Sequence, residues 1–171
     1  MAWDKQKVEA ACAKAYAIAA NIDDCKNFVS AVAALVFTPN AFPKPPWSGG
    51  YDADKLISDH LEPPASGWVA LGNDAQAATS QAEAGKIVVA AMSAAEIGQT
   101  HGHLAIVVGG TEYSGGAGKN VPRCFCGSLS AGGRVPRKVG NTLAYSVAYA
   151  FGASNVSKIR YFWKSPTATT P

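Results

Sequence analysis

Cys25 stands directly behind two carboxylates, in the stretch Asp-Asp-Cys-Lys-Asn-Phe-Val that starts at Asp23 and opens an apolar segment. A cysteine at the start of a helix has its thiolate stabilised by the helix dipole and by free backbone N–H groups. The charges of Asp23 and Asp24 oppose a thiolate, so we interpret these two residues as helix caps. Cys25 is therefore a candidate nucleophile if a base lies nearby, and otherwise a packed core residue.

A base is offered by the stretch Thr-His-Gly-His-Leu-Ala-Ile-Val-Val, which places His101 and His103 two residues apart at the start of an apolar run. A histidine at the first residue of a buried strand is held in place by the sheet and stays accessible to solvent. If this strand lies beside the helix of Cys25, the imidazole can pair with the thiolate, which is the arrangement of covalent cysteine catalysis.

A zinc site is the competing interpretation of the same histidines. His101 and His103, together with Cys124 and Cys126 on a neighbouring strand, would supply four ligands. Zinc-binding cysteines usually follow the spacing C-x₂-C in a tight knuckle, and a spacing of two along a strand suits the metal less well. We therefore expect no metal and no cofactor. The same spacing sets the two Cα atoms roughly 6.5–7 Å apart, which argues against a disulfide between Cys124 and Cys126.

Helices are expected in the first half of the chain. Residues 4–20 repeat apolar side chains at helical spacing, with Cys12 and Ile18 on the apolar side. Residues 23–36 are apolar nearly all round, which predicts a helix in the centre of the fold. Residues 38–51 contain several prolines and predict a long irregular loop that carries Trp47 and Tyr51. Shorter helices are expected at residues 54–61 and 75–84.

Strands are expected in the second half. The apolar or alternating segments that predict them are residues 86–92, 103–109, 123–130 and 157–165. Residues 141–151 predict a short helix, capped by Asn141 and stopped by Gly152. Helices followed by antiparallel strands indicate an α+β fold, which we expect to form a single domain over residues 1–171.

Composition limits the classes of function. A chain of 171 residues with 48% hydrophobic content can build one good core. The net charge of +3 without a run of lysines or arginines argues against a nucleic-acid partner. No apolar run approaches the roughly 18 residues of a membrane span. The first residues lack the apolar core of a signal peptide, so we expect a chain made in the cytoplasm and exported without a cleaved signal.

Three segments of this sequence resemble one enzyme superfamily. The segment beginning at Asp23 resembles the nucleophile helix of the papain-like, NlpC-type bacterial peptidoglycan amidases and endopeptidases, in the form D-x-C-x-x-F-V. The segment from Gly102 resembles their following strand, in which a histidine follows glycine. Residues 123–133, Arg-Cys-Phe-Cys-Gly-Ser-Leu-Ser-Ala-Gly-Gly, are similar to a strand of the amidase effectors that the bacterial type VI secretion system injects into rival cells. The resemblance covers about residues 10–165.

The resemblance implies a papain-like α+β fold and a set of site residues. Cys25 takes the nucleophile position, His103 the base position, and Cys126 the third, base-orienting position. A carboxylate, asparagine or histidine would orient an imidazole better than a thiol, so Cys126 is equally well interpreted as a packed small residue. His101 is expected at the wall of the cleft. The expected substrate-binding residues are Asp24, Lys26, Trp47, Tyr51, His101 and Gly102.

The activity implied by the resemblance is hydrolysis of an amide bond in the peptide stem of peptidoglycan. The preferred bond lies between D-glutamate and meso-diaminopimelate, and the crosslink between diaminopimelate and D-alanine is the second choice. The implied partners are the type VI secretion machinery and a cognate immunity protein, and the implied place of action is the periplasm of a target bacterium. Two alternatives stay open: a non-catalytic glycan- or protein-binding module with structural cysteines, and a papain-like acyltransferase or deamidase.

Overall fold

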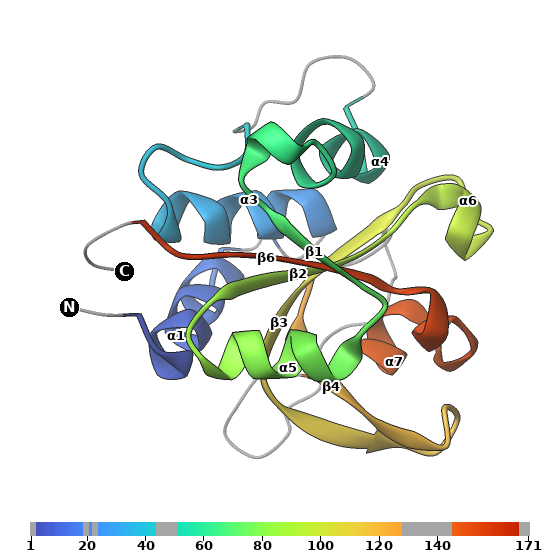
Figure 1. The fold of residues 1–171 in the computed structure, drawn as a ribbon. Coiled ribbons are helices and arrows are strands. Elements are labelled where there is room, and N and C mark those ends of the chain that lie inside the picture. The colour runs from blue at the N-terminus through green and yellow to red at the C-terminus, as the bar shows by residue number, and fades with distance from the viewer. Residues whose placement is uncertain (1–2, 19–20, 22–23, 44–50, 128–144, 168–171) are drawn as a thin grey trace.

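The computed structural model describes residues 3–18, 21, 24–43, 51–127 and 145–167. A six-stranded sheet runs through its centre in the order β1-β6-β2-β3-β4-β5, and every neighbouring pair is antiparallel. Helices pack on both faces of this sheet (Figure 1). The protein therefore has the α+β fold expected from the sequence, in an arrangement compatible with the papain-like fold.

The strands confirm most of the expected pattern. Their bounds are β1 Val69–Gly72, β2 Ile87–Met92, β3 His103–Ser114, β4 Lys119–Phe125, β5 Tyr145–Ser146 and β6 Arg160–Lys164. β2 is buried along its whole length, as its continuous apolar run predicted. β3 extends beyond its predicted segment, and β4 begins four residues earlier than predicted, because a turn at 115–118 joins the two strands into one long hairpin. The predicted end of β4 is wrong: the strand stops at Phe125, Cys126 and Gly127 follow it without strand structure, and residues 128–130 lie outside the described residues. β1 was not predicted, because this short strand at the edge of the sheet is largely exposed and carries no apolar alternation.

One face of the sheet is covered by the N-terminal helices α1 Lys5–Tyr16, α3 Cys25–Val36 and α4 Ala53–Leu56. α4 continues as a π-helical turn, Ile57–Leu61, so the helix predicted at 54–61 is confirmed. α1 is shorter than predicted: it ends at Tyr16, and Ile18, which was expected on the buried side, is 57% exposed. α3 is buried on most of its surface, as predicted, with Ala34 facing solvent.

The opposite face is covered by α5 Ala75–Glu83, α7 Val147–Phe151 and the 3₁₀ turn Ala153–Lys158. α5 confirms the helix predicted at 75–84. The helix predicted at 141–151 is partly wrong: Tyr145 and Ser146 form β5, and the side chain of Ser146 caps α7 by accepting the Tyr149 N–H at 3.3 Å. The expected Asn141 cap lies outside the described residues.

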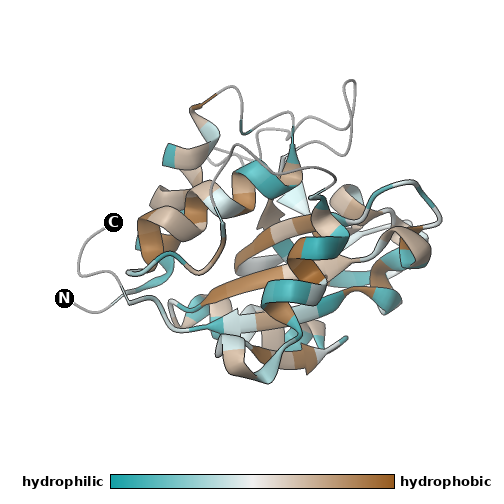
Figure 2. Ribbon diagram, turned by 90° about the horizontal axis from the view of Figure 1, so that it is seen from above, coloured by the Kyte–Doolittle hydropathy of each residue, from teal (hydrophilic) through white to brown (hydrophobic). Residues whose placement is uncertain are grey.

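Two apolar clusters lie on the two faces of the sheet. Figure 2 colours the central strands largely as hydrophobic. Leu104, Ile106 and Val108 of β3 belong to the cluster under α1 and α3, whereas Ala105 and Val107 belong to the cluster under α5 and α7. This alternation follows from the pleat of a strand, and it decides on which side of the sheet each side chain of β3 lies.

Within the described residues, no helix is long and apolar enough to cross a lipid bilayer.

Candidate active site

Cys25 is the first residue of α3 and lies where this helix meets the start of β3. Its side chain is buried, with 7% of the residue exposed. Burial, followed by the charge of Asp24, raises the pKa of the thiol to about 12, although hydrogen bonds from the backbone N–H groups of Leu104 and Lys26 act in the opposite direction. One of these N–H donors, that of Lys26, is at the helix start and the other, that of Leu104, is in β3, but burial outweighs both and Cys25 is a neutral thiol near pH 7.

Asp24 caps α3, as the sequence predicted. Its Oδ1 accepts the backbone N–H groups of Lys26 at 2.9 Å and Asn27 at 3.3 Å. Its Oδ2 forms an ion pair with the ammonium group of Lys26. The carboxylate is thus engaged at the helix start beside Cys25. The substrate-binding roles of Asp24 and Lys26 stay predictions.

His103 is the first residue of β3 and pairs with Met92, the last residue of β2. Only 1% of His103 is exposed. Its ring packs edge to face on the ring of Phe151, with 4.8 Å between the two ring centroids. Its Nδ1 is buried without a hydrogen-bond partner in the described part of the chain. Burial lowers the pKa of His103 to about 3, so the imidazole is neutral.

The side chains of Cys25 and His103 both lie at the start of β3, but on opposite faces of the sheet. The Leu104 N–H contacts the Cys25 thiol, so the backbone next to His103 lies against the candidate nucleophile. The imidazole, however, packs against Phe151, which belongs to the apolar cluster under α5 and α7. Cys25 belongs to the cluster under α1 and α3, on the opposite face of the sheet. The structure therefore brings these residues to one end of the sheet as two neutral groups, without the ion pair that a resting papain-type site would have.

Cys126 follows the last residue of β4 and is 2% exposed. Its thiol contacts the hydroxyl of Tyr145, and that hydroxyl donates to the Cys126 carbonyl oxygen at 3.1 Å. In the contact between the thiol and the hydroxyl, either group can be the donor. Burial raises the pKa of Cys126, and the nearby Cys25 adds to this increase. Cys126 is thus a neutral thiol close to Cys25, held by Tyr145.

The end of β4 packs tightly on the start of α3. A side chain at Gly127 would place its Cβ 2.5 Å from the backbone oxygen of Asp24, so this position requires glycine. This close approach carries Cys126 toward Cys25. The three candidate catalytic residues therefore gather at one end of the sheet, each delivered by a different element.

Gly102 and His101 precede His103 and contact the start of α4. The Gly102 N–H donates to Asp54 Oδ2 at 2.9 Å, and a Cβ on Gly102 would lie 2.7 Å from the Met92 carbonyl oxygen. His101 is exposed, and its Nδ1 lies 4.0 Å from a carboxylate oxygen of Asp52. Glycine is thus required before His103 by packing, whereas the role of the exposed His101 at a cleft wall stays a prediction.

Tyr51 is partly buried and packs against the cluster that contains Cys25. Its ring centroid lies 6.3 Å from that of His60, and burial, followed by the charge of Asp59, raises the pKa of Tyr51 to about 12. Tyr51 therefore has a packing role, beside the predicted role in substrate binding. Trp47 lies outside the described residues.

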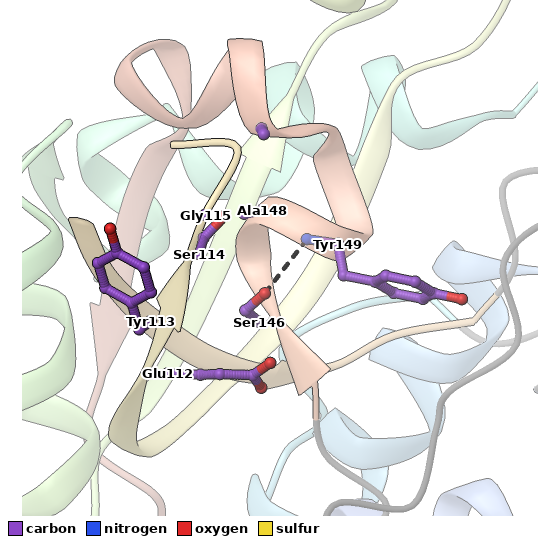
Figure 3. Close-up of a pocket in the computed structure, with 8 residues that line it drawn as sticks. Glu112, Tyr113, Ser114, Gly115, Ser146, Ala148 and Tyr149 are labelled. Carbon is purple, nitrogen blue, oxygen red and sulfur yellow. Dashed lines mark hydrogen bonds between the residues drawn. The ribbon is translucent and has the colours of Figure 1, made fainter. Parts of the chain in front are cut away.

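A cavity of about 320 Å³ lies beside β5 and α7 (Figure 3). It lies between the turn that joins β3 to β4 and the segment β5–α7, and Cys25, His103 and Cys126 are not among its lining residues. The residues that line it are Glu112, Tyr113, Ser114, Gly115, Ser146, Ala148, Tyr149 and Ala153. Its walls share β5 and α7 with the candidate site, since Tyr145 holds Cys126 and Phe151 contacts His103.

The cysteines form no disulfide: Cys12, Cys25, Cys124 and Cys126 are all free and buried. Among the residues that the structure describes, no three histidine, cysteine, aspartate or glutamate side chains are grouped as metal ligands. The four-ligand zinc arrangement is not formed here, because His101 is exposed at the surface while Cys124 and Cys126 lie inside an apolar cluster.

Comparison with known proteins supports the enzyme interpretation. No protein-family model matches the chain. Over 110 residues, however, the chain is 33% identical to "Peptidoglycan amidase Tse1" of Pseudomonas aeruginosa. The chain is similar to a peptidoglycan amidase. The similar region comprises 64% of this chain and spans 58% of the length of Tse1. The similarity to Tse1 thus agrees with the resemblance carried by the sequence motifs.

The burial of neutral His103 predicts that acid destabilises the fold. Between the ordinary histidine pKa of 6.5 and the lowered pKa of about 3, the unfolded chain binds a proton that the folded chain does not. The contribution of His103 to the free energy of unfolding is thus complete above about pH 6.5 and is lost as the pH falls toward 3. His103→Gln, which stays neutral, should weaken the pH dependence between these values, as measured by chemical denaturation. An unchanged dependence would contradict the buried neutral state.

Proposed function

We propose that this protein is a cysteine amidase that hydrolyses an amide bond in the peptide stem of peptidoglycan. The observation that carries the proposal is the meeting of Cys25, at the start of α3, with the start of β3 at His103 and Leu104. The similarity to Tse1 and the three motif segments support the choice of peptidoglycan as substrate.

In the proposed reaction His103 accepts the thiol proton of Cys25 while Sγ attacks the carbonyl carbon of the substrate amide. His103 then gives this proton to the leaving amine, and an acyl-enzyme remains on Cys25. Water attacks the acyl-enzyme, with His103 again as the base, and releases the free thiol. The oxyanion formed in each attack is stabilised by backbone N–H groups at the start of α3.

The first step requires a movement of His103. Its ring now packs on Phe151, and the candidate nucleophile lies on the other face of the sheet. Because His103 is the first residue of β3, its side chain stands at the end of the strand, where a change in χ1 can turn the ring toward Cys25. We propose that substrate binding stabilises this second position of the ring.

The preferred scissile bond lies between D-glutamate and meso-diaminopimelate, and the diaminopimelate–D-alanine crosslink is the second choice. Digestion of purified peptidoglycan, followed by mass spectrometry of the muropeptides, tests activity and bond together. The first bond yields a disaccharide dipeptide together with free peptides that begin with diaminopimelate, whereas the second separates crosslinked dimers into monomers. Unchanged muropeptides with the wild-type chain would contradict the proposed function.

The proposed biological setting follows from the family resemblance. We propose that the type VI secretion machinery delivers this protein into rival bacteria, where it acts in the periplasm, and that a cognate immunity protein covers the site around His103 in the producing cell. The second candidate function is a binding module without catalysis. It is favoured by the buried and neutral state of Cys25 and His103.

A further inference from the structure

The segment that leads into His103 is fastened to a distant part of the chain by one carboxylate. Asp54 Oδ2 accepts the Gly102 N–H at 2.9 Å, and Asp54 Oδ1 accepts the Ala94 N–H at 2.8 Å. Asp54 belongs to α4, whereas Ala94 and Gly102 lie near the two ends of the connection between β2 and β3. One side chain therefore ties both ends of this connection to α4.

The chemistry of the contact suits an aspartate. A carboxylate offers two acceptor oxygens, and hydrogen bonds to an ionised acceptor are roughly twice as strong as those between neutral groups. A side chain at Gly102 would bring its Cβ within 3.2 Å of Asp54 Oδ2, so the absence of a side chain there permits the close approach. Glycine at 102 and aspartate at 54 thus form one unit of packing.

The imidazole ring of His103 has few contacts of its own that would fix its orientation. Its Nδ1 has no hydrogen-bond partner among the described residues, and its ring contact is with Phe151. The position of the imidazole is consequently set by the backbone at the beginning of β3. That backbone is held by its pairing with Met92 and, one residue earlier, by Asp54.

We propose that Asp54 is a positioning residue for His103: by holding the Gly102 N–H, its carboxylate fixes the start of β3 from which the imidazole acts on Cys25. The role rests on the proposed function, and Asp54 itself acts only through Gly102. Loss of this contact leaves Cys25 and its helix in place and displaces the backbone at Gly102, from which the imidazole has to reach Cys25. A misplacement of about 1 Å can cost about 100-fold in rate.

The test compares Asp54→Ala and Asp54→Asn with Asp74→Ala. Asp74 is a matched control, because it also accepts a backbone N–H at the start of a helix, that of Ala77 at 2.9 Å, but on α5 and without contact to the histidine segment. In Asp54→Ala, kcat on peptidoglycan fragments should fall about 100-fold with KM little changed. Asp54→Asn keeps one oxygen acceptor, so its kcat should fall less than that of Asp54→Ala. Asp74→Ala should keep the wild-type kcat.

A second measurement does not depend on the substrate. Nuclear magnetic resonance of the folded variants should show faster amide exchange at Gly102 and Ala94, and shifted imidazole resonances of His103, in Asp54→Asn but not in Asp74→Ala. If the wild-type chain leaves peptidoglycan intact, the proposed function fails and these resonances alone decide the role of Asp54. Unshifted His103 resonances, or a rise in KM at constant kcat, would overturn the proposal.

Discussion

Replacing Cys25 by alanine should abolish the hydrolysis of peptidoglycan and leave the fold intact. The acyl-enzyme forms on this sulfur, and the loss of a catalytic nucleophile costs roughly a thousandfold or more in kcat. The structural cost is small, because one sulfur atom is removed at the start of α3 while the Asp24 cap is unchanged. We expect a loss of about 1 kcal/mol of stability. Muropeptide release and thermal unfolding measure the two effects.

Cys12→Ala is the matched control for this experiment. Cys12 lies in α1 in the same apolar cluster as Cys25 and is fully buried, so the substitution removes the same atom from the same core. Its stability should fall by a similar or larger amount, while its activity stays near that of the wild type. Retained activity in Cys25→Ala would exclude the proposed mechanism and favour the second candidate function, or a nucleophile elsewhere in the chain.

Replacing His103 by alanine should have the next largest effect. A positioned general base contributes about 10²–10⁴-fold, so kcat should fall by that factor. His101→Ala should keep most of the activity, because its side chain is exposed and contacts the surface carboxylate of Asp52. Steady-state assays of both variants on the same peptidoglycan fragments measure the difference between the two histidines.

His103→Gln separates chemistry from packing. Glutamine fills much of the space beside Phe151 but cannot act as a base near neutral pH. If His103→Gln is as inactive as His103→Ala, the lost base is the cause, and the empty space beside Phe151 is not. Wild-type activity in His103→Gln, or a loss of activity in His101→Ala alone, would mean that the base has been assigned to the wrong residue.

Local patterns in the sequence predicted those parts of the site that depend on near neighbours. The Asp24 cap, the start of α3 at Cys25 and the start of β3 at His103 were all predicted, because a cap acts over two or three residues and a buried strand is a continuous apolar run. The same reasoning failed at the end of α1, where an apolar residue at helical spacing, Ile18, lies beyond the last turn. The chemical roles of Cys25, His103 and Cys126 stay predictions.

Contacts between distant residues could not be predicted in this way. Tyr145 holds Cys126 across 19 residues, and Asp54 holds Gly102 across 48, and neither pair leaves a local motif. The charge states of the site residues could not be predicted from the sequence either. A helix start lowers the pKa of a thiol, but the burial that raises the pKa of Cys25 to about 12 is a property of the packed fold.

The position of β6 in the sheet has a consequence for how the protein acquires its shape. This strand is the last of the six in the chain, yet it lies between β1 and β2 and pairs with both. A nascent chain that has not yet released residues 160–164 from the ribosome leaves one edge of the fully buried strand β2 open, with its backbone groups unpaired. The sheet is therefore completed only after residues 160–164 have left the ribosome, and pairing between such distant segments is slow to form.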